Sequence, residues 1–218
     1  MRVVVAGGHG KIARHLGRML ADRGDAVAGL IRDPAHADDL RADGSEPVLL
    51  DIESTDASTL AGHLEGADAA VFAAGAGPGS GVARKDTVDR AGSVLLADAC
   101  ERAGVRRFLQ ISSIGTTAPN PPDVGEVFGA YLDAKRAAEQ DLRGRDLDWT
   151  ILRPGILTDV PPTGRVELTT EARRAEIPRA DVAAVLLALL DEPRSVGLEL
   201  TLIGGETPID EAVRAVLP

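Results

Sequence analysis

Short aliphatic runs alternate along the chain with stretches whose apolar residues recur at helical spacing. After the first run, Ile12, Leu16 and Leu20 repeat every four positions, which is typical of an amphipathic helix. Repeated strand–helix–strand units form a parallel sheet with right-handed crossovers. The predicted strands are residues 2–6, 26–31, 47–50, 69–73, 107–111, 150–152 and 198–202.

This alternation predicts an α/β fold with a doubly wound parallel sheet, formed by a single domain over residues 1–218. A glycine-rich segment, 75–81, follows the fourth predicted strand, and a proline-rich segment, 118–122, follows the fifth. Both are candidate walls of a ligand site, because ligands bind beyond the carboxyl ends of parallel strands. They could equally be ordinary surface loops. We expect the less regular residues 155–180 to form a small C-terminal substrate lobe or lid.

Composition and charge exclude several classes of protein. Aromatic residues make up only 2% of the 218 residues, so the core must be aliphatic. The net charge of −10 disfavours nucleic-acid binding, and we expect no membrane partner, because the chain lacks a long apolar run and a signal-peptide pattern. The single cysteine, Cys100, predicts a cytoplasmic protein without a disulfide framework. The four histidines lack metal-ligand spacing, so we expect no metal site.

The first predicted strand runs into a glycine-rich turn with the spacing G-x-x-G-x-x-A. Gly7, Gly10 and Ala13 hold the three defining positions. Glycines let the backbone approach a pyrophosphate, and the start of the next helix, at Lys11 and Ile12, supplies free N–H groups. We therefore predict a Rossmann-type dinucleotide site here, the alternative being a purely structural turn.

The end of the second strand predicts which dinucleotide binds. Arg32 stands where a residue that contacts the ribose is expected, and a guanidinium suits the 2′-phosphate of NADP. NADP(H) is therefore favoured over NAD(H), also because Lys11 and Arg14 flank the glycine turn. Asp33 could instead take the role of an NAD-binding carboxylate, or could cap a helix that starts at Pro34. Asp51 could contact the adenine or cap the next helix.

The only tyrosine, Tyr131, precedes Lys135 by four residues, and the chain has only three lysines. On a helix this spacing places both side chains on one face. A nearby ammonium favours the phenolate, so we expect Lys135 to lower the pKa of Tyr131. The fifth strand ends in Ser112 and Ser113, hydroxyls that can bond a substrate carbonyl.

These motifs together resemble the short-chain dehydrogenases/reductases. More closely, the chain is similar to the short atypical branch of NAD(P)H-binding proteins called NmrA-like or biliverdin/flavin reductase B-like. The resemblance rests on the glycine turn, on Ile-Ser-Ser at 111–113, on Tyr131-x-x-x-Lys135 and on Asp-Trp-Thr-Ile-Leu-Arg-Pro-Gly at 148–155.

The resemblance implies a role for each of several residues. Tyr131 would donate a proton. Lys135 would adjust the pKa of Tyr131 and bind the ribose, and Ser113 would orient a carbonyl. Ala73, Ala74, Gly75 and Pro154 would border the cofactor. The sequence departs from the family in one respect: its single asparagine, Asn120, lies in the proline-rich segment, and the helix that usually carries a catalytic asparagine offers Asp89 and Gly92.

The implied function is an NADP(H)-dependent oxidoreductase that reduces a small carbonyl, quinone or flavin-like acceptor by hydride transfer, acting as a monomer or homodimer on a small-molecule substrate. One alternative is a non-catalytic NADP(H)-binding redox sensor. The other is a nucleotide-sugar epimerase or dehydratase, which the short chain after Pro154 disfavours.

Overall fold

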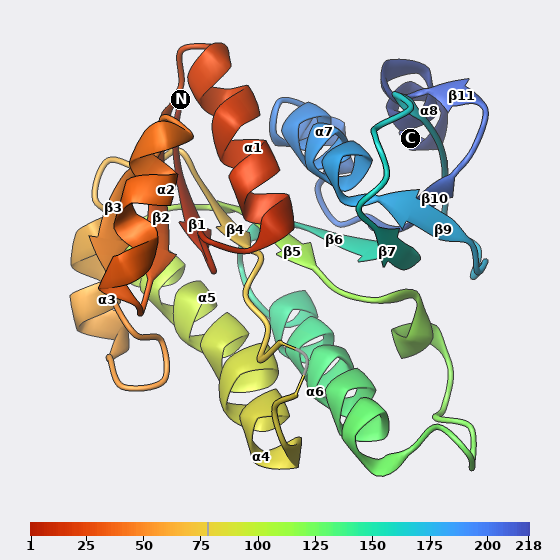
Figure 1. Ribbon diagram of the computed structural model, residues 1–218, viewed down its shortest axis with the longest axis horizontal. Helices are drawn as coiled ribbons and strands as arrows, with labels where there is room; N and C mark the ends of the chain where they lie inside the picture. Colours follow the sequence, from red (N-terminus) through yellow and green to blue (C-terminus); the bar gives the residue numbers. More distant parts are fainter. Residues whose placement is uncertain (78) are drawn as a thin grey trace.

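The computed structural model describes residues 1–77 and 79–218; Pro78, within the predicted glycine-rich segment, lies outside the described residues. Within them, the central sheet has nine strands in the order β11-β8-β10-β6-β5-β4-β1-β2-β3 (Figure 1). The strands of this sheet are β1 (Arg2–Ala6), β2 (Ala26–Ile31), β3 (Glu46–Leu49), β4 (Ala69–Phe72), β5 (Arg107–Ile111), β6 (Asp148–Pro154), β8 (Arg165–Thr169), β10 (Glu199–Gly204) and β11 (Thr207–Pro208).

The strands from β3 to β10 are parallel, as predicted, and β8 and β11 add an antiparallel edge. The chain winds outward from β1 in both directions, first through β2 and β3 and then through β4, β5 and β6. The order therefore reverses between β1 and β4, the place where doubly wound sheets bind ligands.

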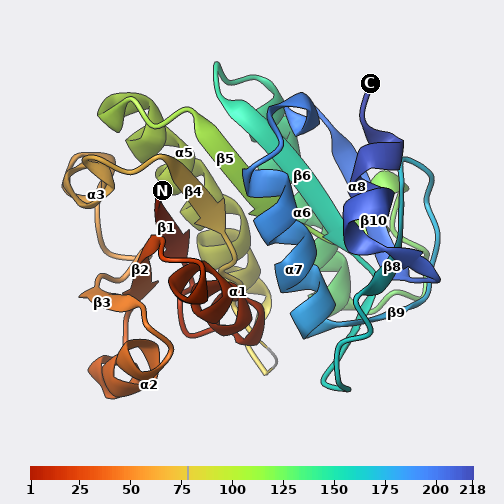
Figure 2. The ribbon, with the colours of Figure 1, turned by 90° about the horizontal axis from the view of Figure 1, so that it is seen from above.

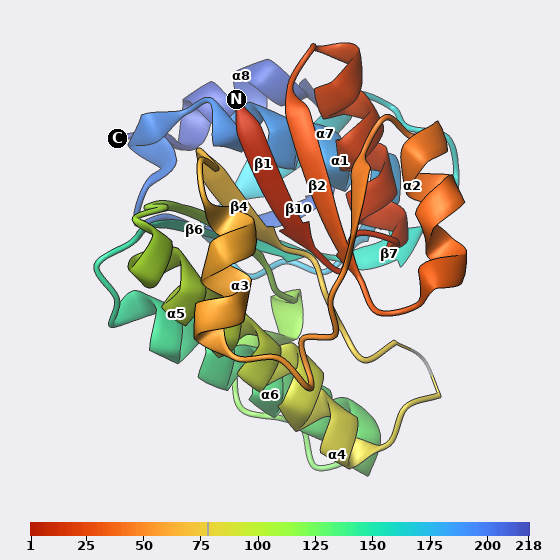
Figure 3. The same cartoon turned by 90° about the vertical axis from the view of Figure 1, so that its left-hand side faces the viewer.

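Helices cover both faces of this sheet (Figure 2). The apolar stripes of α1 (Lys11–Asp22), α7 (Arg179–Leu190) and α8 (Ile209–Val216) pack on one face with β1, β5 and β10 side chains. On the other face lie α3 (Ala57–Leu64), α5 (Ala91–Ala103) and α6 (Glu126–Arg143) (Figure 3). The other helical segments are η1 (Pro34–His36), α2 (Ala37–Ala42), α4 (Val82–Arg84), the π-helical turn η2 (Lys85–Arg90), η3 (Ile114–Thr117) and η4 (Pro193–Ser195).

The segment predicted as a lobe, residues 155–180, contains three short strands. β7 (Ile156–Thr158) and β9 (Glu176–Pro178) form a separate two-stranded parallel sheet. Between them, β8 pairs with β10 and so extends the central sheet. Val166 and Ile177 from this segment are buried in the same apolar core as α1 and α7, so the segment is anchored to the sheet by its apolar side chains.

Cys100 is buried on the inner side of α5, and burial raises the pKa of its thiol to about 12. A buried thiol with a raised pKa is typical of a core residue rather than of a nucleophile. Across residues 1–77 and 79–218, no helix combines the length and apolarity needed to cross a bilayer.

Gly8 marks a tight crossing between the turn after β1 and the end of β2, and its replacement should destabilise the fold. A Cβ at Gly8 would lie 2.6 Å from the Cα of Gly29, and the nearest atoms are backbone atoms. We expect Gly8→Ala to lower the free energy of unfolding by about 1–3 kcal/mol, because two backbone segments must separate. Urea unfolding measures this loss.

Gly62 provides a matched control, because a Cβ at this position in α3 would meet open space. Gly62→Ala should therefore raise the free energy of unfolding by up to about 1 kcal/mol through helix propensity. If the two variants were equally stable, the crossing at Gly8 would not constrain the fold.

Candidate functional site

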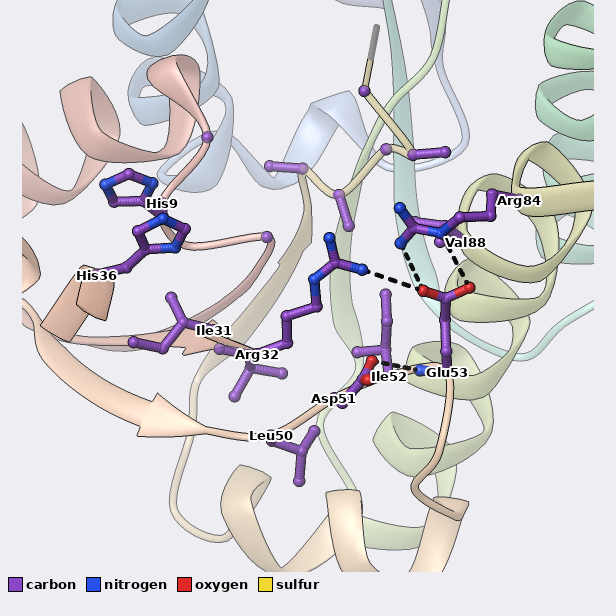
Figure 4. A pocket seen from close by; sticks show the side chains of 18 residues that line it. His9, Ile31, Arg32, His36, Leu50, Asp51, Ile52, Glu53, Arg84 and Val88 are labelled. Carbon is purple, nitrogen blue, oxygen red and sulfur yellow. Dashed lines mark hydrogen bonds and ion pairs between the residues drawn. The ribbon is translucent and has the colours of Figure 1, made fainter. Parts of the chain in front are cut away.

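A cavity of about 580 Å³ lies at the carboxyl ends of β1, β2, β3 and β4, at the reversal of strand order (Figure 4). Its walls are the segments that follow these four strands and one side of the helical segment α4–η2. The lining residues are Gly7, His9, Gly10, Leu30, Ile31, Arg32, His36, Leu50, Asp51, Ile52, Glu53, Ala73, Ala74, Gly75, Ala76, Gly77, Arg84 and Val88.

Most of the predicted cofactor residues meet at this cavity. Gly7, Gly10, Arg32, Asp51, Ala73, Ala74 and Gly75 line it, while Lys11, Ile12, Lys135 and Pro154 are not among the described lining residues. The sequence analysis missed several lining side chains, which include His9, His36, Glu53 and Arg84. Arg84 and Glu53 come from segments without any motif of their own.

The glycine turn joins β1 to α1 at one end of the cavity. Gly7 has a φ of +79°, and a Cβ there would lie 2.6 Å from the Cα of Ala74, so the turn packs directly against the loop after β4. Gly10 caps α1, and no side chain of the described residues bonds the first N–H groups of the helix, whose first turn also lacks acidic residues. These open donors and the positive end of the helix dipole suit a diphosphate.

Arg32 extends from the end of β2 toward two side chains on the opposite wall (Figure 4). Its Nη1 lies 3.4 Å from Oε2 of Glu53, and Arg84 Nη2 lies 2.5 Å from the same oxygen. The Arg84 side chain and the hydroxyl of Thr87 both bond Glu53 and hold the pKa of its carboxyl below its usual value. The side chain of Arg32 is 56% exposed, so its guanidinium remains accessible to a ligand.

The hydrogen bonds of the two aspartates show which of them caps a helix. Asp33 accepts from the N–H of Ala35 at 2.9 Å and caps η1, so it acts as the helix cap. Asp51 lines the cavity and accepts from the N–H of Glu53, whereas α3 is capped by Asp56.

The two other cations expected near the phosphates are engaged elsewhere. Lys11 Nζ lies 2.5 Å from Asp159, and Arg14 forms ion pairs with Asp39 and Asp43. Arg32 is therefore the predicted cation that lines the cavity. Neither Lys11 nor Arg14 is among the described lining residues, so the expectation of NADP rests here on Arg32.

Tyr131 and Lys135 lie on one face of α6, and a second lysine approaches the same ring. Lys135 Nζ lies 5.9 Å and Lys85 Nζ 5.7 Å from the centre of the Tyr131 ring. Lys85 is buried in η2 and donates to the carbonyl of Gly77 at 3.0 Å. The sequence analysis did not select Lys85, although it is one of only three lysines.

Asp89, on the helical segment η2, lies opposite these lysines. It is fully buried, its Oδ1 lies 3.4 Å from Lys135 Nζ, and its Oδ2 accepts from the N–H of Ala76 at 3.1 Å. Lys135 also donates to the carbonyls of Ala74 and Ile111. The turn η2 and α6 therefore hold the loop 74–77, which forms one wall of the cavity.

The pKa of Tyr131 is opposite to the expectation from its spacing to Lys135. Burial, and after it the negative charge of Asp89, raise the pKa of the phenol to about 12, while the hydrogen bond with Ser113 acts in the other direction. Burial also lowers the pKa of Lys135. The expected lowering is absent because burial disfavours the phenolate most, and the charge of Asp89 adds to this effect. Tyr131 is therefore a protonated acid at neutral pH.

The two serines after β5 have different surroundings. Ser112 is buried and donates to Glu139, which also accepts from Arg153. Arg153 is therefore part of a buried ion pair. Ser113 remains partly exposed beside Tyr131. Within the described ranges, no cluster of histidine, cysteine or acidic side chains could hold a metal ion.

A nicotinamide dinucleotide suits this arrangement. The cavity offers open N–H groups at α1, a guanidinium at the end of β2 and a carboxylate after β3, and the loop 74–77 connects it with Tyr131. These are the groups that a diphosphate, a ribose phosphate and an adenine require.

Comparisons with known proteins agree with this reading of the cavity. A family model described as "NAD(P)H-binding" matches residues 7–193. The protein named "Uncharacterized sugar epimerase YhfK" of Bacillus subtilis (strain 168) is 33% identical over 98% of this chain and 99% of its own length.

Two solved structures share the fold over nearly the whole chain. One, from Bacillus halodurans, is named for the NAD-dependent epimerase/dehydratase class; it has a TM-score of 0.91 and 32% identity and covers 99% of this chain and 100% of its own. The other, the oxidoreductase ylbE of Lactococcus lactis, has a TM-score of 0.86 and 26% identity over 99% of this chain and 96% of its own. The chain belongs to the NAD(P)H-binding family.

Proposed function

We propose that this protein is an NADP(H)-dependent reductase of small acceptors, with Tyr131 as the proton donor. The observation that carries the proposal is a protonated, partly buried phenol that lies between two lysines and beside the loop that borders the dinucleotide cavity. The name of the similar Lactococcus protein, an oxidoreductase, supports this class of reaction.

Each residue of this cluster has a task in such a reaction. Bound NADPH supplies a hydride. Tyr131 then provides the proton that the acceptor's oxygen or nitrogen requires, and Ser113 hydrogen-bonds that atom to orient it. Lys135 and Asp89 hold the loop 74–77 in place through the carbonyl of Ala74 and the N–H of Ala76.

The surroundings of Tyr131 favour a planar, apolar acceptor such as a quinone or flavin. Phe128 stacks on Tyr131 with a centroid distance of 5.7 Å, although 52% of Phe128 is exposed. Val82 and Val127, on the adjoining helices α4 and α6, are also exposed. Aromatic residues make up only 2% of the chain, so an exposed phenylalanine beside the proton donor is a natural stacking surface for a flat acceptor.

Binding titrations of NADPH, NADH and FMN, followed by NADPH oxidation with a panel of carbonyls, quinones and flavins, test the proposal. Tight NADPH binding with acceptor-dependent oxidation supports it. Tight binding without oxidation across the panel would indicate the redox sensor instead.

Sugar epimerase or dehydratase chemistry is the second candidate, because the similar Bacillus protein carries that name. YhfK is matched by this chain over 99% of its own length. Interconversion or dehydration of nucleotide sugars without net consumption of the cofactor would identify this activity.

The role of Arg32 leads to a specific prediction for cofactor binding. Arg32→Gln should raise the Kd for NADPH about tenfold and leave the Kd for NADH within about twofold, because only the 2′-phosphate uses the guanidinium. Fluorescence titration measures both constants. Arg41→Gln, an exposed arginine of α2 paired with Asp38, is the control. An equal loss of affinity for NADPH and NADH would show that Arg32 does not bind the 2′-phosphate.

A further inference from the structure

The wall opposite Arg32 carries a fixed negative charge. Glu53 is held from two sides: Thr87 donates to its Oε1 at 2.6 Å, and Arg84 bonds both carboxylate oxygens. Arg84 and Thr87 lie on the continuous helical segment α4–η2, so the carboxylate is anchored to a helix. Arg32 makes only one contact with Glu53, at 3.4 Å, whereas Arg84 makes one at 3.4 Å and a second at 2.5 Å, so Arg32 is the more weakly held of the two arginines.

The difference in exposure shows which of these contacts a ligand can replace. The side chain of Glu53 is 23% exposed and that of Arg84 is 35% exposed, whereas Arg32 is 56% exposed. A phosphate that reaches Arg32 therefore displaces only the weak contact. The phosphate then lies beside the anchored carboxylate of Glu53, and the two negative charges repel each other.

We infer that Glu53, held by Arg84 and Thr87, is a specificity-determining residue that limits how strongly the cavity prefers a 2′-phosphate over a 2′-hydroxyl. This inference rests on the proposed cofactor site and extends it from one residue, Arg32, to a group of opposed charges. Arg32 attracts the phosphate, Glu53 opposes it, and Arg84 neutralises Glu53. Natural sites often obtain specificity from such a repulsive element.

Two substitutions should move the preference in opposite directions. Glu53→Gln keeps the shape and an oxygen for Thr87 but removes the charge, so NADPH should bind about threefold to tenfold more tightly while NADH changes less than twofold. Arg84→Met leaves Glu53 without its main partner, so Glu53 competes for Arg32 and NADPH should bind several-fold more weakly. Glu65→Gln removes an equal charge outside the cavity lining and should change neither constant.

The experiment measures Kd for NADPH and NADH, and for the fragments 2′,5′-ADP and 5′-AMP, by calorimetry on the wild type and the three variants. Opposite shifts for Glu53→Gln and Arg84→Met, confined to the phosphorylated ligands, support the inference. Unchanged discrimination, or a loss of NADH affinity in Glu53→Gln, overturns it and leaves the cofactor site standing. If the wild type binds none of the four ligands, both the site and the inference are wrong.

Discussion

Tyr131→Phe should lower kcat for reduction by about 10²–10⁴-fold, the usual contribution of a positioned general acid. The substitution removes only the hydroxyl. The ring that stacks on Phe128 remains, so the fold and cofactor affinity should be unchanged. Steady-state NADPH oxidation, with any acceptor that the panel identifies, measures the loss. Thr117→Val, which removes an exposed hydroxyl from the neighbouring η3, is the control and should retain full activity.

The pH dependence provides a second readout of the same role. Since burial and Asp89 raise the pKa of Tyr131 to about 12, the phenol stays protonated throughout the neutral range. The tyrosine should therefore cause no alkaline fall in kcat/KM between about pH 6 and pH 9, because kcat/KM reports the free enzyme. An unchanged kcat in Tyr131→Phe with every accepted substrate would exclude this residue as the acid.

The central sheet could be predicted because its signals are local and repeated. Each predicted strand is present, and the bounds of β1, β2 and β5 match the aliphatic runs to the residue. Buried parallel strands need continuous aliphatic sequence, so a composition almost without aromatic residues makes them conspicuous. The strands β7, β9 and β11 were not predicted because they have only two or three residues. β8 was not predicted because its buried Val166 and Leu168 alternate with polar residues and form no continuous aliphatic run.

The candidate site shows a similar division between local and distant features. Tyr131 and Lys135 are four residues apart on one helix, so the sequence places them together. Glu53 and Arg84 are 31 residues apart in the chain and meet only because β3 and α4 end at the same edge of the cavity. Lys85 and Asp89 face the loop 74–77 from a π-helical turn, which a helical repeat of 3.6 residues does not reveal.

The pKa of Tyr131 is raised where a lowered value was expected, and the reason again lies in residues that are distant in sequence. Sequence spacing indicates that the phenol and the ammonium of Lys135 lie close together. Burial and the charge of Asp89 decide whether the pKa of Tyr131 is raised or lowered. Asp89 comes from another helix and neutralises Lys135 at 3.4 Å. A prediction of the charge state therefore needs the tertiary structure, whereas a prediction of the pair does not.

Glu139→Gln should lower the free energy of unfolding by about 3 kcal/mol, the largest loss of stability that we expect from a single isosteric change. The carboxylate is fully buried on α6 and accepts from Arg153 at 2.6 and 3.0 Å and from Ser112 at 2.5 Å. An amide removes one of the two carboxylate charges that compensate the buried guanidinium, the other being Glu199, and turns a donor toward it. Urea unfolding at pH 7 measures the difference.

The stability of the wild type should also fall in acid, because this cluster keeps its carboxylates ionised. Burial would raise the pKa of Glu139, but the bonds from Arg153 and Ser112 outweigh burial and lower it. Arg143, chiefly, lowers the pKa of Glu199 to about 2. A depressed carboxyl pKa stabilises the fold above its ordinary value, about 4.5, and this stabilisation is lost as the pH falls toward 2. In Glu139→Gln the acid dependence should be smaller.

Asp133→Asn provides the matched control on the same helix, because it also exchanges a carboxylate for an amide. Asp133 pairs with Arg136 at 2.6 Å but is 63% exposed, so its loss should cost at most about 1 kcal/mol. Adding Arg153→Met to Glu139→Gln should recover part of the lost stability, since the buried cation, which then has only the partly exposed Glu199 as a partner, is gone. Equal losses in the two single variants would show that Glu139 acts as a surface ion pair, and the absence of recovery would show that Arg153 is not the cation it compensates.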